Sequence, residues 1–284
     1  MKKIGIITFE DFDGRKDIGS AMIRAKWIIS KWKEAGPDLG EAELFKFGEK
    51  YDAVIFQKAY WHDYAENFKG VKILDICDAD FLHWAYPIKR TMVACNAVTC
   101  SSEKLATALV DFAELPVYYI PDCILEPEKL PHKKHSGPVK KVAWFGYSEN
   151  FPMLDAAVPA LAKRGLELIV VAPKPYSPGM HKIRVENYPW MKDTWIGDIS
   201  KADMVINPRF SGGRFMYKSD NKTVQAWSLG LPVAHDDKEL DHIIALSPEA
   251  RQEFGDERRK WVQENRDVKK AVEMFKKALI DCGL

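Results

Sequence analysis

Short apolar runs alternate with amphipathic stretches along the first half of the chain. The runs have the length of buried strands, and the longer stretches carry apolar residues at helical spacing. Predicted strands cover residues 3–9, 52–58, 71–77, 93–101 and 117–120, and predicted helices cover 18–32 and 103–112. This alternation is typical of βαβ units around a parallel sheet.

A second series of the same kind begins after residues 126–138, EPEKLPHKKHSGP, whose prolines and charges indicate a linker. Its predicted strands cover 139–145, 166–172, 202–207 and 231–234, and its predicted helices cover 151–163 and 221–229. We therefore predict an α/β protein with two Rossmann-like domains, 1–125 and 139–255. Residues 256–284 are expected to form a C-terminal helix that packs on the body.

Composition narrows the class of protein. Hydrophobic residues make up 46% and charged residues 29% of the 284 positions, which is typical of a globular protein and excludes disorder. The net charge is +1, with 19 basic and 21 acidic side chains in residues 1–138, so bulk charge gives little support to a nucleic-acid partner. No apolar run reaches the roughly 20 residues of a transmembrane helix. The five cysteines are odd in number and form no C-x-x-C pair of a zinc or redox site, so a reducing cytoplasm fits best.

Three common nucleotide-binding or catalytic motifs are absent or incomplete in this sequence. No G-x-G occurs, so a dinucleotide fingerprint is absent. The glycine spacing of 14–20, GRKDIGS, matches a P-loop but lacks its lysine, and 146–150, GYSEN, lacks the last glycine of a nucleophile elbow. No metal site is expected from the spacing of the seven histidines.

The most informative segment is 202–234, ADMVINPRFSGGRFMYKSDNKTVQAWSLGLPVA. It reads as a buried strand, a glycine-containing loop, a short helix and a second strand. Ser219 or Asp220 is expected to cap the helix, and Gly230 suits the left-handed position after it. Cations gather before and in its first turn, where they oppose the helix dipole unless an anion is bound. These cations are Arg209, Arg214, Lys218 and Lys222. A phosphate or diphosphate site is therefore predicted, with a solvated basic loop as the alternative.

The run NKTVQAWSLGLPVA, preceded by ADMVINP and by the glycine turn of KKVAWFGYSEN, resembles the C-terminal nucleotide-sugar domain of GT-B glycosyltransferases. The resemblance covers 139–235 and is faint over 1–125. It implies two Rossmann-like domains facing across a cleft, with the donor bound by the second and the acceptor site shaped by the first. The residues that it implies on the donor side are Gly14, Gly146, Tyr147, Lys174, Trp190, Arg209, Arg214, Lys218, Ser219, Asn221 and Lys222.

The sequence departs from the family pattern at one point. Many retaining members carry glutamates at the two ends of an E-x7-E stretch. In the corresponding neighbourhood this chain has Lys218 and Gln225, or Lys222 and nearby residues. The donor sugar and the stereochemistry therefore stay open. For the nucleotide base, the resemblance points to 172–174 and 188–190, although packing also accounts for Trp190.

Acidic residues after the first-half strands are candidates for removing the acceptor's proton. The catalytic candidates are Asp13, Asp78, Asp80 and His83. Capping of turns is an alternative role for the aspartates, and packing for the histidine. Arg24 and its neighbouring lysines are expected on a solvated helix face.

The function expected from these features is sugar transfer from a UDP- or GDP-sugar, used as substrate with no further cofactor, to an unidentified acceptor. The alternative is a GT-B-like module that binds a nucleotide or sugar phosphate without turnover, or a partner subunit. A modified DNA base is a further candidate acceptor. The oligomeric state is left open.

Overall fold

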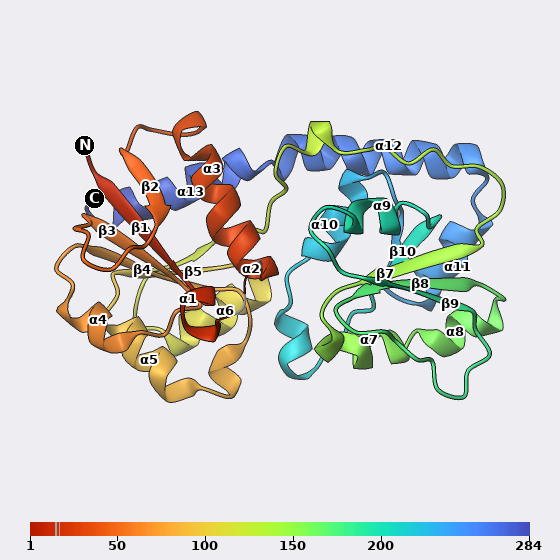
Figure 1. Ribbon diagram of the computed structural model, residues 1–284, viewed down its shortest axis with the longest axis horizontal. Coiled ribbons are helices and arrows are strands. Elements are labelled where there is room, and N and C mark those ends of the chain that lie inside the picture. The colour runs from red at the N-terminus through yellow and green to blue at the C-terminus, as the bar shows by residue number, and fades with distance from the viewer. Residues whose placement is uncertain (15, 17) are drawn as a thin grey trace. The chain divides into compact units, whose positions relative to one another are not determined.

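The computed structural model describes residues 1–14, 16 and 18–284, with the side chain of Asp13 left aside. The chain forms two compact units. Unit 1 comprises Met1–Leu125, Gly212–Asp220 and Asn265–Leu284, and unit 2 comprises Glu126–Ser211 and Asn221–Glu264. Each unit is built around its own parallel sheet (Figure 1).

The sheet of unit 1 has the strand order β2-β1-β3-β4-β5-β6, and all its pairs are parallel. Its strands are β1 (Lys3–Thr8), β2 (Glu41–Leu44), β3 (Ala53–Gln57), β4 (Val71–Ile76), β5 (Ala97–Cys100) and β6 (Val117–Tyr119). Its helices are α1 (Glu10–Asp13), α2 (Gly19–Ala21), the π-helix η1 (Met22–Lys26), α3 (Trp27–Lys31), η2 (Trp32–Glu34), α4 (His62–Asn67), η3 (Asp80–Leu82), α5 (Ala85–Val93), α6 (Glu103–Phe112), η6 (Gly213–Tyr217) and α13 (Val268–Asp281).

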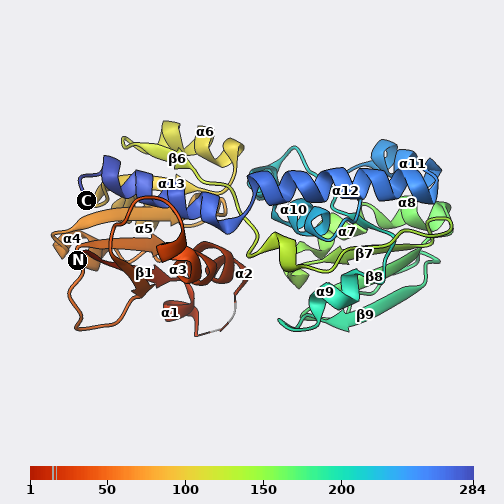
Figure 2. The same ribbon diagram turned by 90° about the horizontal axis from the view of Figure 1, so that it is seen from above.

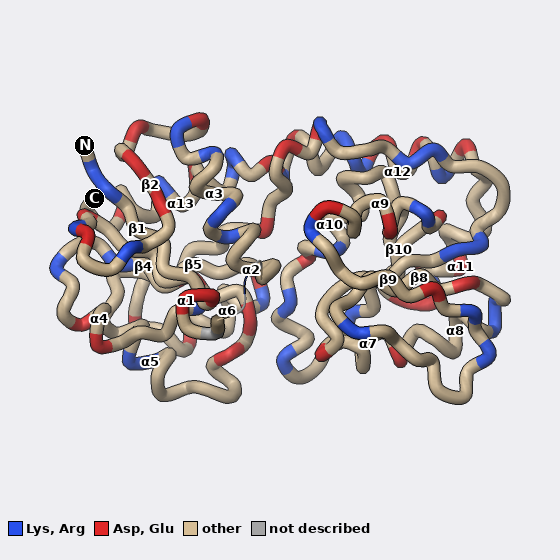
Figure 3. Tube along the Cα trace, in the orientation of Figure 1, with Lys and Arg blue, Asp and Glu red and all other residues tan. Residues whose placement is uncertain are grey.

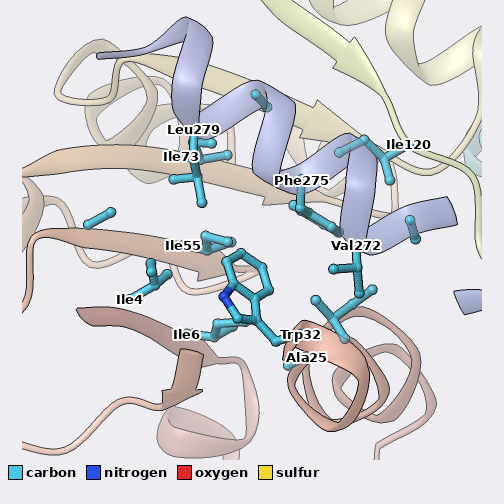
Figure 4. Packing of buried hydrophobic residues seen from close by; sticks show 14 of the residues in the cluster. Ile4, Ile6, Ala25, Trp32, Ile55, Ile73, Ile120, Val272, Phe275 and Leu279 are labelled. Carbon is cyan, nitrogen blue, oxygen red and sulfur yellow. The ribbon is translucent and has the colours of Figure 1, made fainter. Parts of the chain in front are cut away.

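Alternate residues of these strands point to opposite faces, because the side-chain period of a strand is two. Ile4, Ile6 and Ile55 pack with Trp32 and with Phe275 of α13 on one face (Figure 4). The intervening residues of the strands pack against α5 and α6 on the other face. Helices therefore cover both faces, as a parallel sheet requires.

The sheet of unit 2 has the order β11-β10-β7-β8-β9, again parallel, and β7, β8 and β9 lie side by side in Figure 2. Its strands are β7 (Lys141–Phe145), β8 (Glu167–Ala172), β9 (Val185–Pro189), β10 (Met204–Ile206) and β11 (Val233–Ala234). Its helices are η4 (Pro127–Lys129), η5 (Ser148–Asn150), α7 (Phe151–Asp155), α8 (Val158–Lys163), α9 (Trp195–Ile199), α10 (Asn221–Ser228), α11 (Asp237–Ala245) and α12 (Pro248–Asn265).

The α/β class and the two parallel sheets agree with the prediction. Gly230 follows α10 with φ 74°, the left-handed conformation expected for it. A Cβ there would lie 2.7 Å from the His132 ring, which also favours glycine.

The end of the chain differs from the prediction of one helix over 256–284. The helix breaks at 266–267, and the Asp267 carboxylate caps α13 by accepting from the Lys269 N–H at 2.8 Å. Val272, Phe275 and Leu279 of α13 are buried in the core of unit 1. The predicted domain 139–255 is also interrupted, because residues 212–220 belong to unit 1.

Candidate functional site

A lysine lies over a glycine turn at the carboxyl edge of the unit 2 sheet. Gly146 follows β7 with φ 149°, and a Cβ on it would lie 2.5 Å from Nζ of Lys222. The Lys222 ammonium also lies 4.3 Å from the centre of the Trp144 ring. Lys222 stands in the first turn of α10, where the helix dipole attracts anions. We call Gly146, Lys222 and the first turn of α10 the candidate donor site.

A chain of side-chain hydrogen bonds fixes the start of α10 to the ends of β10 and β11. Asn207 Nδ2 donates to Thr223 Oγ1 at 3.0 Å, and the Thr223 hydroxyl lies 2.9 Å from Nε2 of His235. Nδ1 of His235 lies 2.7 Å from the Glu239 carboxylate, which also accepts the His235 backbone N–H. Because an ionised carboxylate only accepts, neutral His235 carries its proton on Nδ1 and accepts from Thr223.

Sequence reasoning did not single out this network. A signal was present, because Asn207 and His235 are each the first residue after a buried strand. In a parallel sheet such residues share the carboxyl edge, where ligands of doubly wound sheets bind.

Replacing Gly146 by alanine tests the contact between the turn and the lysine. The added Cβ would displace the Lys222 ammonium, and φ 149° is a strained conformation for alanine. We expect affinity for UDP to fall about tenfold, as after loss of one charged contact, with the α10 network intact. Calorimetric titration measures this loss, and Gly179→Ala, in a loop with open space around a Cβ, controls for glycine strain alone. Unchanged affinity in Gly146→Ala would argue against close approach of a ligand to this turn.

Other predicted donor-side residues reach the same edge of unit 2. Tyr147 follows β7 and is exposed, and Lys174 follows β8 and is exposed, with its N–H bonded to Ser148 Oγ at 3.2 Å. Trp190 follows β9, is half-buried and packs on the core. Arg209 follows β10 and is exposed, and Asn221 begins α10. The strand ends therefore bring these residues to one edge of the sheet.

The rest of the predicted basic loop belongs to unit 1. Nζ of Lys218 lies 2.5 Å from Oδ1 of Asp78, and Ser219 Oγ donates to Asp122 Oδ2 at 2.6 Å. Asp220 accepts from Arg266 at 2.7 Å. Arg214 is exposed, with its guanidinium 5.0 Å from the centre of the Phe215 ring. The cations predicted as one cluster are thus divided between the two units.

Asp78 is held ionised by two ammonium groups. Its Oδ2 lies 2.7 Å from Nζ of Lys58, and its Oδ1 binds Lys218. Burial opposes ionisation, but the two lysines outweigh it and lower the pKa of Asp78 to about 2. Burial works to lower the pKa of Lys58, but Cys77 and the carboxylates of Asp78 and Asp80 raise it above its usual range. A carboxylate with so low a pKa is a weak proton acceptor, which favours an ion-pairing role for Asp78.

The remaining catalytic candidates have different surroundings. Asp80 accepts from the Tyr60 hydroxyl at 2.8 Å and lies 3.2 Å from Nζ of Lys58. His83 is exposed. The side chain of Asp13 lies outside the described residues. Gly14 ends α1 with φ 75°, and a Cβ on it would meet open space.

The ion pairs of Asp78 predict a dependence of stability on pH. Since the folded pKa, about 2, lies below the ordinary 3.8, the carboxylate's contribution is complete above about pH 4 and is lost as the pH falls toward 2. We expect the free energy of unfolding of Asp78→Asn to fall short of wild type by about 2 kcal/mol near pH 5 and by much less near pH 2. Urea denaturation across this range measures the difference. A gap that stays constant with pH would contradict the lowered pKa.

Two features are absent from the described part of the chain. No group of three or more His, Cys, Asp or Glu side chains there is placed to hold a metal ion. None of the helices described combines the length and the apolar character that crossing a bilayer takes.

Known proteins resemble this chain in structure. No family model matches the sequence, and no curated protein matches it. HepE of Anabaena, solved with UDP and glucose, matches with a TM-score of 0.67 and 14% identity over 99% of this chain and 100% of HepE. The lipopolysaccharide outer core galactosyltransferase WaaB, in its apo form, matches with a TM-score of 0.64 and 12% identity over 98% and 99% of the two chains. T4 phage BGT, solved with its UDP-glucose substrate, matches with a TM-score of 0.59 and 13% identity over 98% and 99%. The chain therefore shares the GT-B fold with these three proteins.

Proposed function

We propose that the chain is a glycosyltransferase that uses a nucleotide-diphosphate sugar as donor. The observation that carries this proposal is the position of Lys222 over the Gly146 turn, at the start of α10. A cation, a turn without a side chain and a helix N-terminus together favour a diphosphate. HepE and BGT, which share the fold, were solved with UDP or UDP-glucose, and this makes UDP-sugars the first donors to test.

Transfer of the sugar breaks one bond and forms another, and this determines which charges the donor site must stabilise. The bond between the sugar's anomeric carbon and the diphosphate oxygen breaks, and a bond to an acceptor hydroxyl oxygen forms. Negative charge grows on the leaving diphosphate, where Lys222 stabilises it electrostatically. Lys174, Arg209, Tyr147 and Asn221 are proposed as further donor contacts, with the Trp190 ring as a platform for the base.

The acceptor hydroxyl must also lose its proton. The proposed proton acceptors are Asp13, Asp80 and His83 of unit 1. Asp78 is less suited, because its pKa of about 2 makes it a weak base. Three residues of the predicted basic loop belong to unit 1, namely Arg214, Lys218 and Ser219. Since Lys218 and Ser219 bind carboxylates there, we do not propose these residues as main donor contacts.

The compartment proposed is the cytoplasm. All five cysteines are free thiols, and burial raises the pKa of Cys95, Cys100 and Cys123 to about 12, which keeps them protonated and unreactive. Free buried thiols are typical of proteins from reducing compartments.

Nucleotide release separates transfer from binding alone. The chain is incubated separately with UDP-glucose, UDP-galactose and GDP-mannose. Two quantities are measured, the free UDP or GDP released and the melting temperature of the protein. If the chain is an enzyme, the nucleotide sugar raises its melting temperature and free nucleotide appears above the background in buffer, and Lys222→Ala reduces both effects at the same nucleotide concentration. A raised melting temperature without release supports the alternative of a binding module. No thermal effect of UDP or GDP would contradict the donor site itself.

A further inference from the structure

Three aromatic rings meet at the carboxyl edge of the unit 1 sheet. Phe12 follows β1, Phe47 follows β2 and Trp61 follows β3, and these strands are neighbours in the order β2-β1-β3. The centre of the Trp61 ring lies 5.9 Å from that of Phe12 and 5.5 Å from that of Phe47. Strands far apart in sequence thus deliver these rings to one place. We call Phe12, Phe47 and Trp61 the aromatic platform.

The platform is open to solvent but supported from within the unit. Phe12 is 51% exposed and Phe47 is 74% exposed. Trp61 is half-buried and stacks on Tyr64, with ring centres 4.5 Å apart and planes at 18°. Tyr64 in turn stacks on Phe68 at 5.7 Å. Exposed rings in mutual contact cost hydration free energy, and such patches commonly mark binding surfaces.

The charges beside the platform disfavour an anionic ligand. Phe12 stands in the sequence Glu10-Asp11-Phe12-Asp13 on α1, where the tube of Figure 3 is coloured for acidic residues. Glu10 is bound to Lys26 at 2.8 Å, whereas Asp11 is exposed beside the ring. The lysine beside Phe47, Lys46, is bound to Glu43 at 2.9 Å. Nucleic acids and anionic lipid surfaces bind where lysine and arginine gather. Acids next to a ring suit a neutral molecule that has many hydroxyl groups.

We propose that the aromatic platform binds a neutral saccharide, and that this saccharide is the acceptor of the transferase proposed above. The apolar face of a pyranose ring packs on aromatic side chains through its C–H groups. Its hydroxyl groups donate hydrogen bonds to carboxylates, which accept only, and the exposed carboxylate of Asp11, one oxygen of which accepts from the Thr8 N–H, lies beside Phe12. That the saccharide is the acceptor rests on the proposed function, whereas saccharide binding itself rests on the platform alone.

Saturation-transfer NMR on the full chain tests the platform directly. The probes are maltotriose, cellotriose and chitotriose at millimolar concentration, with no donor present. The double variant Phe12→Ser with Phe47→Ser removes the two exposed rings and spares the half-buried Trp61. Tyr86→Ser is the matched control, because Tyr86 is also 74% exposed on unit 1 but lies on α5, outside the platform.

We expect wild type and the control to bind at least one trisaccharide, and the double variant to bind it about tenfold more weakly. Equal binding by all three proteins, or no binding of any trisaccharide by wild type, would overturn the proposal. So would platform-dependent binding of oligothymidine or of phosphatidylglycerol vesicles without saccharide binding.

The melting temperature with UDP, measured on the same proteins, keeps the two proposals apart. The platform variants should retain the full effect of UDP, since no platform residue belongs to unit 2. Saccharide binding without any effect of UDP on the melting temperature would contradict the proposed donor site and support the proposed platform. An effect of UDP without saccharide binding would do the reverse.

Discussion

Lys222→Ala is expected to weaken the binding of UDP by about 10- to 150-fold, which corresponds to the 1.5–3 kcal/mol of a charge-assisted hydrogen bond. The ammonium group lies over the Gly146 turn and against the face of Trp144, so its position is set before a ligand arrives. A cation held in place loses little side-chain entropy on binding. Calorimetric titration with UDP and with uridine measures the effect. Affinity for uridine should barely change, because it lacks the diphosphate.

Lys182→Ala is the matched control for this loss. Lys182 is exposed and lies just before β9, at the amino end of that strand. The substitution therefore removes one positive charge from the opposite edge of the same sheet. Its effect on UDP affinity should stay within about twofold and vanish at high salt. Equal losses in both variants would mean that overall charge, and not the Lys222 contact, attracts the diphosphate.

Arg24→Met is expected to lower the free energy of unfolding by about 3–5 kcal/mol, the usual cost of leaving buried charge unpaired. Arg24 is 2% exposed and lies in the π-helix η1. It donates to both carboxylate oxygens of Asp75, at 2.9 and 2.5 Å, and to the Ile120 carbonyl at 2.6 Å. It also lies 3.3 Å from Asp122, whose pKa is raised by burial despite this attraction. Urea denaturation gives the change in stability.

Two comparisons decide whether the buried carboxylates cause that loss. Arg90→Ala breaks an ion pair with Glu66 that is exposed on both sides, and it should cost at most about 1 kcal/mol. Adding Asp75→Asn to Arg24→Met removes the stranded charge and should restore part of the stability. A double variant no more stable than Arg24→Met would assign the loss to packing around the arginine.

Much of the fold could be predicted from the sequence because buried parallel strands are continuous apolar runs. The runs at 71–77 and 166–172 appear as β4 and β8 within a residue or two. The edge strand β2 was missed because its sequence, Glu41-Ala-Glu-Leu44, is half polar and partly exposed. Residues 93–96 were predicted as strand but lie in or after α5, since an apolar run alone does not distinguish helix from strand.

Less of the candidate site could be predicted. Gly146 and Lys222 were identified from a turn and a helix start, both local patterns, and the structure brings them into contact. The division of Lys218 and Lys222 between units depends on distant partners, Asp78 and Trp144, which no local pattern reveals. Arg24 shows the same limit. The expected solvated face is wrong for it, because its partners Asp75 and Asp122 come from far along the chain.

The route of the chain bears on how the protein is made. Strands β1 to β6 are synthesised first, yet one face of their sheet is covered by α13, which includes Phe275 and Leu279. A growing chain that has not reached Asn265 covers this face with Ala25, Ile28 and Trp32, but it lacks the buried residues that α13 adds to the core. Domains otherwise tend to fold as they leave the ribosome. The core of unit 1 is complete only after α13 has been synthesised, whereas unit 2 has all its segments by Glu264 and can complete its core earlier.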